Sequence, residues 1–168
     1  MEKIWLAEYK KTGIPESVAL PAENTSLVDI FERNFQKYGS RDAFIFMDKV
    51  LTFNELEVAS RKFATYLQSL NLAKGTRVAV MMPNVFQYPV VALGIFRAGL
   101  VLVNVNPLYT ARELDHQLND SGAEVLVIIE NFASVYQTIV GKTPVKHVVV
   151  ASVGDMLGTL KGTLVNFV

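Results

Sequence analysis

The stretch GTRVAVMMPNVFQYPVVALGIFRAGLVLVNVNPLYTARELDHQLNDSGAEVLVII, residues 75–129, decides the fold of this chain. Three apolar, strand-like runs lie within it and a fourth follows, namely Val78–Met82, Val101–Val105, Val125–Ile129 and Val148–Val150. The runs begin at residues 78, 101, 125 and 148, so successive starts lie 23, 24 and 23 residues apart. This interval is typical of a strand, a crossover helix and a parallel strand. The sequence therefore predicts an α/β fold, a mostly parallel sheet with helices on both faces.

The residues before this region predict further elements. Residues 1–24 show no clear period and are expected to form an extended arm. A helix is expected to begin at Ser26 and to stop at Gly39. Two short runs, Ala43–Phe46 and Val50–Phe53, predict a β-hairpin.

Polar residues and a proline mark the starts of the later helices. Thr52 stands three residues before Glu55, and Thr110 three before Glu113, so each pair predicts a capping box. Pro89 removes a backbone donor, so its helix is expected either to kink there or to begin late, near Gln87. The expected caps after the first and third runs are Asn84 and Asn131.

Composition excludes several classes of protein. Of the 168 residues, 51% are hydrophobic and 19% charged, so the chain is not disordered. The net charge is +0 and no cluster of Lys and Arg stands out, so the sequence shows no basic patch of the kind that binds nucleic acid. Cysteine is absent, which excludes disulfides and thiolate sites. Charges in the first eight residues interrupt any secretory signal, so a cytoplasmic protein is expected. Tyr88–Val105 is long enough to imitate a membrane span, but Arg97 in its middle favours a buried helix and strand.

Two glycine-containing segments are candidates for a phosphate-binding loop. Gly94 and Gly99 have the first spacing of a Walker loop, but Leu100 and Val101 replace its Lys and Ser/Thr. Packing is the preferred interpretation, in which the small residues Gly94 and Ala98 let their helix lie close to the sheet. A second segment, Gly158 to Thr163, has phosphate-compatible residues but lacks adjacent glycines, and it stays a minor alternative.

Metal and acid–base sites are weakly indicated. Glu113 and His116 share a helix face, but a metal site needs three or four ligands, so a solvated face is preferred. His147 is expected to precede or open a strand. Asp115 and Asp120 have no paired acid.

The best candidates for ligand binding follow the second strand. Asn104, Asn106 and Tyr109 lie at its carboxyl end, where open α/β sheets bind ligands. The alternative is that Asn106 and Pro107 simply make the turn.

Several motifs, taken in order, resemble the beginning of acyl-adenylate-forming, AMP-binding enzymes. They are LTFNEL (51–56), GTRVAVMMPN (75–84), RAG (97–99), VNVNPLYTAREL (103–114) and QLNDSGA (117–123). Asn104 to Thr110, with Trp5 and Leu6, resemble most closely the bacterial long-chain fatty acid–CoA ligases of that family. Thr76 departs slightly, because the family usually has Gly-Asp at this position.

The resemblance implies a reaction in two steps. ATP and a long-chain fatty acid give an acyl adenylate and pyrophosphate, and the thiol of CoA then displaces AMP, with Mg²⁺ and positive side chains stabilising phosphate charge. The family's phosphate loop, nucleotide contacts, Mg²⁺-associated acid and catalytic Lys lie later in its chains. No catalytic, cofactor-binding or metal residue is therefore assigned here, and Lys161 lacks the context of the catalytic Lys.

The resemblance also implies a partial domain. Residues 25–168 would form the N-terminal portion of the large adenylating domain, cut before the phosphate loop, because the chain stops inside an apolar run at Val168. The piece alone is expected to be inactive, to bind no cofactor tightly and to self-associate through unpaired strand edges. The full enzyme is expected to act on fatty acid, ATP and CoA, with peripheral contact at the inner membrane. The alternative function is a free-standing, non-catalytic α/β module that binds a nucleotide or a partner.

Overall fold

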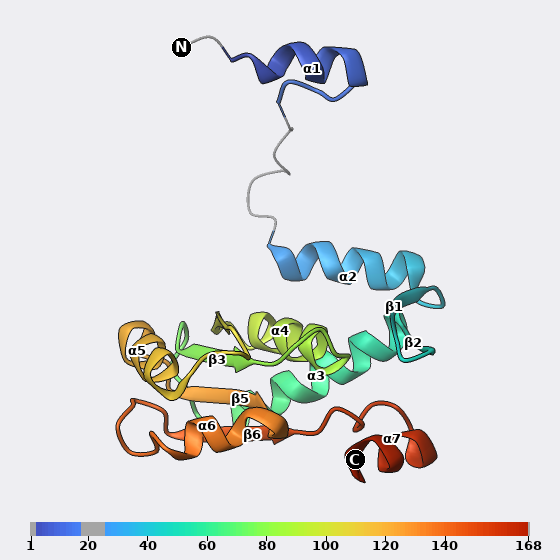
Figure 1. The fold of residues 1–168 in the computed structure, drawn as a ribbon. Helices are drawn as coiled ribbons and strands as arrows, with labels where there is room; N and C mark the ends of the chain where they lie inside the picture. Colours follow the sequence, from blue (N-terminus) through green and yellow to red (C-terminus); the bar gives the residue numbers. More distant parts are fainter. Residues whose placement is uncertain (1–2, 18–25, 168) are drawn as a thin grey trace.

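The computed structural model describes residues 3–17 and 26–167, and its centre is a sheet with helices around it (Figure 1). Strands and helices alternate in the order β3 (Arg77–Met81), α4 (Gln87–Arg97), β4 (Val101–Val105), α5 (Ala111–Ser121), β5 (Val125–Ile129), α6 (Ala133–Gln137) and β6 (His147–Ala151). The four strands pair in parallel in the order β4-β3-β5-β6. The predicted parallel α/β fold is therefore confirmed.

Side chains of the sheet alternate between two apolar clusters, one on each face. The first face packs against α3 (Phe53–Ser69) and α4, in a cluster that includes Leu67, Val78, Val80, Ile95, Val125 and Val127. The second face packs against α5 and α6, in a cluster that includes Ala79, Met81, Leu114, Leu118, Leu126, Ile128 and Tyr136. Every residue of β5 is buried, which explains its unbroken apolar run.

A third cluster joins the sheet to the elements before it. The helix α2 (Leu27–Tyr38) leads into an antiparallel hairpin of β1 (Asp42–Phe46) and β2 (Lys49–Thr52), which lies at the far end of α2 in Figure 1. The buried apolar residues of this cluster include Phe35, Leu51, Leu56, Phe86 and Leu93. Met47 and Asp48 have φ values of 48° and 59°, as a two-residue hairpin turn requires. The predicted helix and hairpin are confirmed.

Three of the helices begin with a capping box. In α2, α3 and α5 the side chain of the N-cap residue accepts a hydrogen bond from the backbone N–H of the third helical residue. The carboxylate of that third residue accepts a hydrogen bond from the backbone N–H of the N-cap residue. The pairs are Ser26 with Asp29, Thr52 with Glu55 and Thr110 with Glu113. The two boxes predicted from spacing are therefore confirmed, and each satisfies two backbone donors that would otherwise lack a partner.

The prediction of an extended arm over residues 1–24 is wrong in its first half. Residues Trp5–Thr12 form the helix α1, which ends where Gly13 adopts a φ of 72° and donates to the carbonyl of Tyr9. No residue of α1 is buried, so α1 does not require the periodic apolar face by which a helix is recognised in a sequence. Residues 18–25, which hold the end of the predicted arm and its boundary with the next helix, lie outside the described residues.

Neither asparagine expected as a helix cap has that role. The helix α4 begins at Gln87, so the late start is confirmed, and its N-cap is Phe86 rather than Asn84. Pro89 falls in the first turn, where a missing backbone N–H breaks no helical bond. Asn131 lies within a short 3₁₀ turn, η1 (Glu130–Phe132), which precedes α6.

Two glycines serve close packing in a way that the sequence did not indicate. A Cβ on Gly94 would lie 2.7 Å from Cδ1 of Phe63 and 3.2 Å from the carbonyl oxygen of Ser60, so Gly94 brings α4 close to α3 rather than to the sheet. Gly39 is not left-handed, with a φ of −43°, but a Cβ there would lie 2.2 Å from Oδ1 of Asn54.

The apolar run Tyr88–Val105 divides at Gly99 into α4 and β4, as the central arginine indicated. In the described ranges, no helix combines the length and apolar character needed to cross a membrane.

Candidate functional site: the carboxyl edge of the sheet

The carboxyl ends of the four parallel strands meet at one edge of the sheet, the usual ligand side of an open α/β fold. We call this region the carboxyl edge and define it by Gln87, Tyr88, Asn104, Asn106 and Tyr109, which follow or end β3 and β4. The two asparagines and Tyr109 were predicted as ligand candidates. The structure places all three at this edge, together with two residues of α4.

Asn104 is held between two helices. Its Oδ1 accepts from the hydroxyl of Tyr88 at 2.9 Å, and its backbone carbonyl accepts from Nε2 of Gln117 in α5 at 2.8 Å. The Oε1 atom of Gln117 is buried and has no protein partner in the described structure. These bonds fix the end of β4 to both neighbouring helices, which gives Asn104 a positioning role.

Asn106 makes the turn that follows β4. Its Oδ1 accepts from the backbone N–H of Leu108 at 3.0 Å, and its carbonyl accepts from the N–H of Tyr109 at 3.1 Å. A short polar side chain that accepts from the backbone two residues on is typical of an Asx turn. The alternative that Asn106 and Pro107 form the turn is therefore confirmed. Tyr109 packs against the cluster on the α5–α6 face.

Gln87, at the start of α4, bonds to the segment after β6 and was not predicted as a site residue. Its buried side chain donates through Nε2 to the carbonyl oxygens of Ser152, at 2.6 Å, and Val153, at 3.3 Å. Its Oε1 atom is buried without a protein partner. The only sequence signal was a glutamine inside an apolar stretch. This contact joins the start of α4 to the segment after β6.

An open hollow of about 580 Å³ lies beside the edge, lined by Thr110, Arg112, Glu113 and His116. Oε2 of Glu113 already accepts from the hydroxyl of Thr110 at 2.7 Å and from its backbone N–H at 2.9 Å, and these bonds lower the pKa of Glu113. Among the residues that the structure describes, no group of three or more His, Cys, Asp or Glu side chains could hold a metal ion. The Glu113–His116 pair therefore has no third ligand, and a capping role accounts for Glu113.

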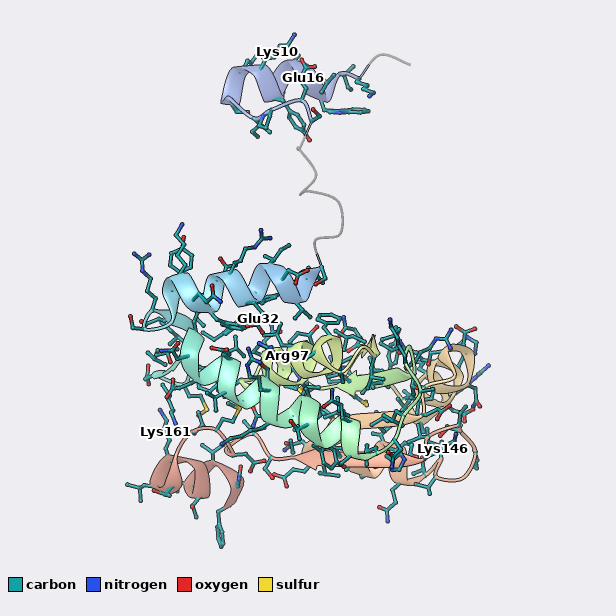
Figure 2. All side chains as sticks on the ribbon, turned by 180° about the vertical axis from the view of Figure 1, so that it is seen from behind. Lys10, Glu16, Glu32, Arg97, Lys146 and Lys161 are labelled. Carbon is teal, nitrogen blue, oxygen red and sulfur yellow. The ribbon has the colours of Figure 1, made fainter. Side chains whose placement is uncertain are left out.

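The segment proposed as a minor phosphate candidate forms a helix. α7 spans Thr159–Phe167, and Gly162 within it approaches Gly154 so closely that a Cβ would lie 2.4 Å from the Gly154 carbonyl oxygen. Lys161 donates to the carbonyl of Met47 and lies 3.8 Å from the carboxylate of Asp48 (Figure 2). The glycine thus serves packing, and the lysine binds the hairpin turn.

The other polar candidates lie apart from the edge. His147 opens β6, as predicted, opposite Val125 of β5. Asp115 accepts from the side chain of Asn119 at 3.2 Å within α5. Among the described residues, no side-chain hydrogen bond joins Asp115 or Asp120 to the carboxyl edge.

A largely buried charge lies between α2, α3 and α4. The Arg97 side chain is 8% exposed, donates to Glu32 and, through Nε, to the hydroxyl of Ser60 at 3.1 Å (Figure 2). Its Cζ lies 5.4 Å from the ring centroid of Phe35. Arg61, which is more exposed, also donates to Glu32 at 2.8 Å. This network fastens α2 to the sheet layer.

Residues 31–166 match the AMP-binding enzyme family, so this chain belongs to that family. The match covers the sheet, its flanking helices and the hairpin. The family predicted from the ordered motifs is therefore confirmed.

Bacterial long-chain-fatty-acid–CoA ligases are among the relatives similar to this chain. The chain is 54% identical to the long-chain-fatty-acid–CoA ligase of Escherichia coli O157:H7, over 100% of this chain and 30% of that enzyme. It is 50% identical to the ligase of the same name from Haemophilus influenzae, with the same coverage. The chain thus spans about a third of the length of these relatives.

Solved structures show the same fold. A long-chain-fatty-acid-CoA ligase from Archaeoglobus fulgidus superposes with a TM-score of 0.74 at 27% identity, over 90% of this chain and 31% of that chain. An anthranilate CoA ligase, solved in complex with anthranoyl-AMP, gives a TM-score of 0.73 at 25% identity, over 79% and 27% of the two chains.

Proposed function

We propose that this chain forms the N-terminal part of an ATP-dependent long-chain fatty acid–CoA ligase. The observation that carries the proposal is the 54% identity to the Escherichia coli enzyme over the whole of this chain. In the proposed reaction, a fatty acid and ATP form an acyl adenylate and pyrophosphate, and CoA then displaces AMP to give acyl-CoA. The chemistry requires Mg²⁺ and positive groups near the phosphates.

Within that enzyme, we assign residues 25–168 to scaffolding of the adenylating domain. Three carboxylates, those of Asp29, Glu55 and Glu113, are engaged in capping boxes. Asn104 and Asn106 bond to neighbouring side chains or backbone. These contacts support a chain that positions the sheet, and we route no step of ATP, Mg²⁺ or CoA binding through its residues.

A chimera tests the ligase assignment. Residues 1–168 would replace the matching N-terminal segment of the Escherichia coli ligase, and oleoyl-CoA formation would be measured with ATP, Mg²⁺, CoA and oleate. A parallel chimera with the matching Haemophilus influenzae segment controls for the junction. We expect both chimeras to form oleoyl-CoA. A folded chimera of this chain without product, beside an active control, would contradict the proposal.

The isolated chain tests the scaffolding assignment. Residues 1–168 alone are expected to form no acyl-CoA in the same assay and to give no stoichiometric heat with a non-hydrolysable acyl-adenylate mimic. Turnover or tight capture of the mimic would show that binding groups lie within the chain. The non-catalytic module, by contrast, predicts a specific ligand for the isolated chain.

We also propose a cytoplasmic enzyme that contacts the inner membrane peripherally, because a long-chain fatty acid partitions into lipid. Flotation of the chimera with phospholipid vesicles, with and without oleate, measures this contact. For the isolated chain we propose self-association through unpaired strand edges.

A further inference from the structure

The polypeptide that leaves β6 at the carboxyl edge is held by a buried side chain from α4. We call residues 152–158 the exit segment; it has no regular helix or strand and leads into α7. Nε2 of Gln87 donates to the carbonyl oxygens of its first two residues, Ser152 at 2.6 Å and Val153 at 3.3 Å. Gln87 begins α4, which follows β3, and β5 lies between β3 and β6 in the sheet. The glutamine therefore connects segments that follow two strands which are not neighbours.

The amide of Gln87 is suited to hold two carbonyl groups at once. Its nitrogen carries two N–H donors, whereas its oxygen only accepts, so the nitrogen must face the two carbonyl oxygens. Gln87 is 6% exposed, so water competes little for these bonds. An apolar side chain of similar length would fill the same space but would not hold the exit segment.

The exit segment depends on such bonds for its shape. The N–H of Ser152 donates to Oδ2 of Asp155 at 2.8 Å, and the N–H of Asp155 donates to the Ser152 carbonyl at 3.2 Å. The N–H of Gly154 donates to Oδ1 of Asn166 in α7 at 2.6 Å, and the N–H of Leu157 donates to the Gly154 carbonyl at 2.9 Å. Gln87 thus anchors the start of a connected series of hydrogen bonds.

Two apolar side chains keep the exit segment against the core. Val153 packs against the cluster on the α3–α4 face, and Leu157 is buried in the third cluster, beside residues of the hairpin. The segment therefore crosses from one cluster to the other within a few residues. Apolar contact is non-directional, so it does not by itself fix the backbone at the carboxyl edge. The hydrogen bonds from Gln87 supply that direction.

We propose that Gln87 is a positioning residue for adenylate formation, and that it acts by holding the exit segment in place at the carboxyl edge. This inference rests on the ligase function proposed above. Open α/β sheets bind ligands outside the carboxyl ends of their strands, and the exit segment begins there. A displacement of about 1 Å caused by a change far from the reacting atoms can lower a rate by about 10²-fold. Gln87 itself touches no reacting atom; it acts through the exit segment.

Pre-steady-state kinetics of the Escherichia coli chimera test this role. Gln87→Met keeps a similar length and removes the donor. With oleate, ATP and Mg²⁺ at saturation and no CoA, the first turnover releases pyrophosphate in a burst. The burst rate constant reports adenylate formation, and the burst amplitude reports the amount of active enzyme. We expect Gln87→Met to lower the rate constant at least about tenfold.

Arg97→Met is the matched control for lost stability. Arg97 lies in the last turn of the same helix, and its contacts are with Glu32, Ser60 and Phe35 rather than with the exit segment. Its replacement is expected to lower the burst amplitude at most and to leave the rate constant unchanged. A purely structural role of Gln87 would give the same pattern as this control.

Hydrogen exchange of the same chimeras measures the exit segment directly. The N–H groups of Ser152, Gly154 and Leu157 all donate within the protein, so they exchange slowly while the segment is held. Because Gln87→Met removes two hydrogen bonds, it should speed their exchange by roughly tenfold. The N–H groups of β5 should be unaffected, and Arg97→Met should leave the exit segment protected.

Each outcome decides between the alternatives. An inactive wild-type chimera contradicts the ligase proposal, on which this inference depends. An active wild-type chimera whose Gln87→Met variant keeps the burst rate constant overturns the positioning role alone, whether or not the amplitude falls. A slower burst without faster exchange in the exit segment also overturns it, because the effect of Gln87 would then not pass through that segment. A slower burst together with faster exchange supports it.

Discussion

Replacing Arg97 with methionine is the sharpest test of how α2 is fastened to the sheet layer. Methionine retains an apolar stem but removes the bonds to Glu32 and Ser60 and the contact with Phe35. Removal of one partner from a buried ion pair costs about 3–5 kcal/mol. Glu32 is 28% exposed and keeps its bond to Arg61, so we expect a loss of about 2–3 kcal/mol in the free energy of unfolding.

Arg61→Met is the matched control, because it removes the same charge from the same partner. The Arg61 side chain is 55% exposed and also pairs with Glu57, so its bond to Glu32 is worth about 0–1 kcal/mol. The double variant Glu32→Met/Arg97→Met removes both buried charges and should recover part of the loss, since apolar replacements of a whole pair are often tolerated.

Urea unfolding followed by circular dichroism measures these differences in the free energy of unfolding. The m value should stay constant across the series, as expected for an unchanged unfolded state. Equal losses for Arg97→Met and Arg61→Met would refute the argument, because burial would then have no bearing on the strength of the contact with Glu32. A double variant less stable than Arg97→Met alone would refute the claim that the partly buried Glu32 carboxylate, left with Arg61 as its partner, causes the loss.

Three further predictions concern local structure. The pKa of Glu55 is lowered chiefly by the backbone hydrogen bond from Thr52, so its carboxylate stabilises the fold above about pH 4.5, and the contribution is lost as pH falls through the folded pKa. Glu55→Gln should therefore flatten the acid side of the stability–pH curve measured by urea unfolding. Thr110→Ala should cost about 1 kcal/mol in urea unfolding through the lost cap of α5, with Thr138→Ala as the control. Gly94→Val should cost at least about 2 kcal/mol, because a side chain there meets Phe63 and the Ser60 backbone; a neutral effect would disprove the tight α3–α4 contact.

The features predicted correctly are those that depend on neighbours in the sequence. A capping box requires two side chains three residues apart, so Thr52 with Glu55 and Thr110 with Glu113 carry their own evidence. Strand runs of β-branched residues, repeated at a crossover interval, fix a parallel sheet in the same way. The failure at Asn84 has a local cause too, since Pro89 favours the first turn and moves the start of α4 to Gln87.

Long-range partners explain what sequence reasoning missed. Gln87 finds its acceptor at Ser152, 65 residues away, and Arg97 finds Glu32 at the same separation. No spacing rule connects such residues. Each lies in an apolar run, where a polar side chain signals a partner without indicating which one. The helix α1 was missed for the opposite reason, because it buries none of its residues and leaves no apolar period.

The carboxyl edge shows why residue type and position alone were insufficient there. Asn104 and Asn106 both follow the pattern of a ligand site, at the end of a parallel strand. In the structure the Oδ1 atom of each is occupied, that of Asn104 by Tyr88 and that of Asn106 by the backbone of Leu108. An oxygen that already accepts from the protein must break that bond before it can serve a ligand, and the turn made by Asn106 would then lose its anchor. This cost favours a role in holding the edge rigid, and it supports the proposal that the groups handling phosphate and thioester lie on other parts of the enzyme.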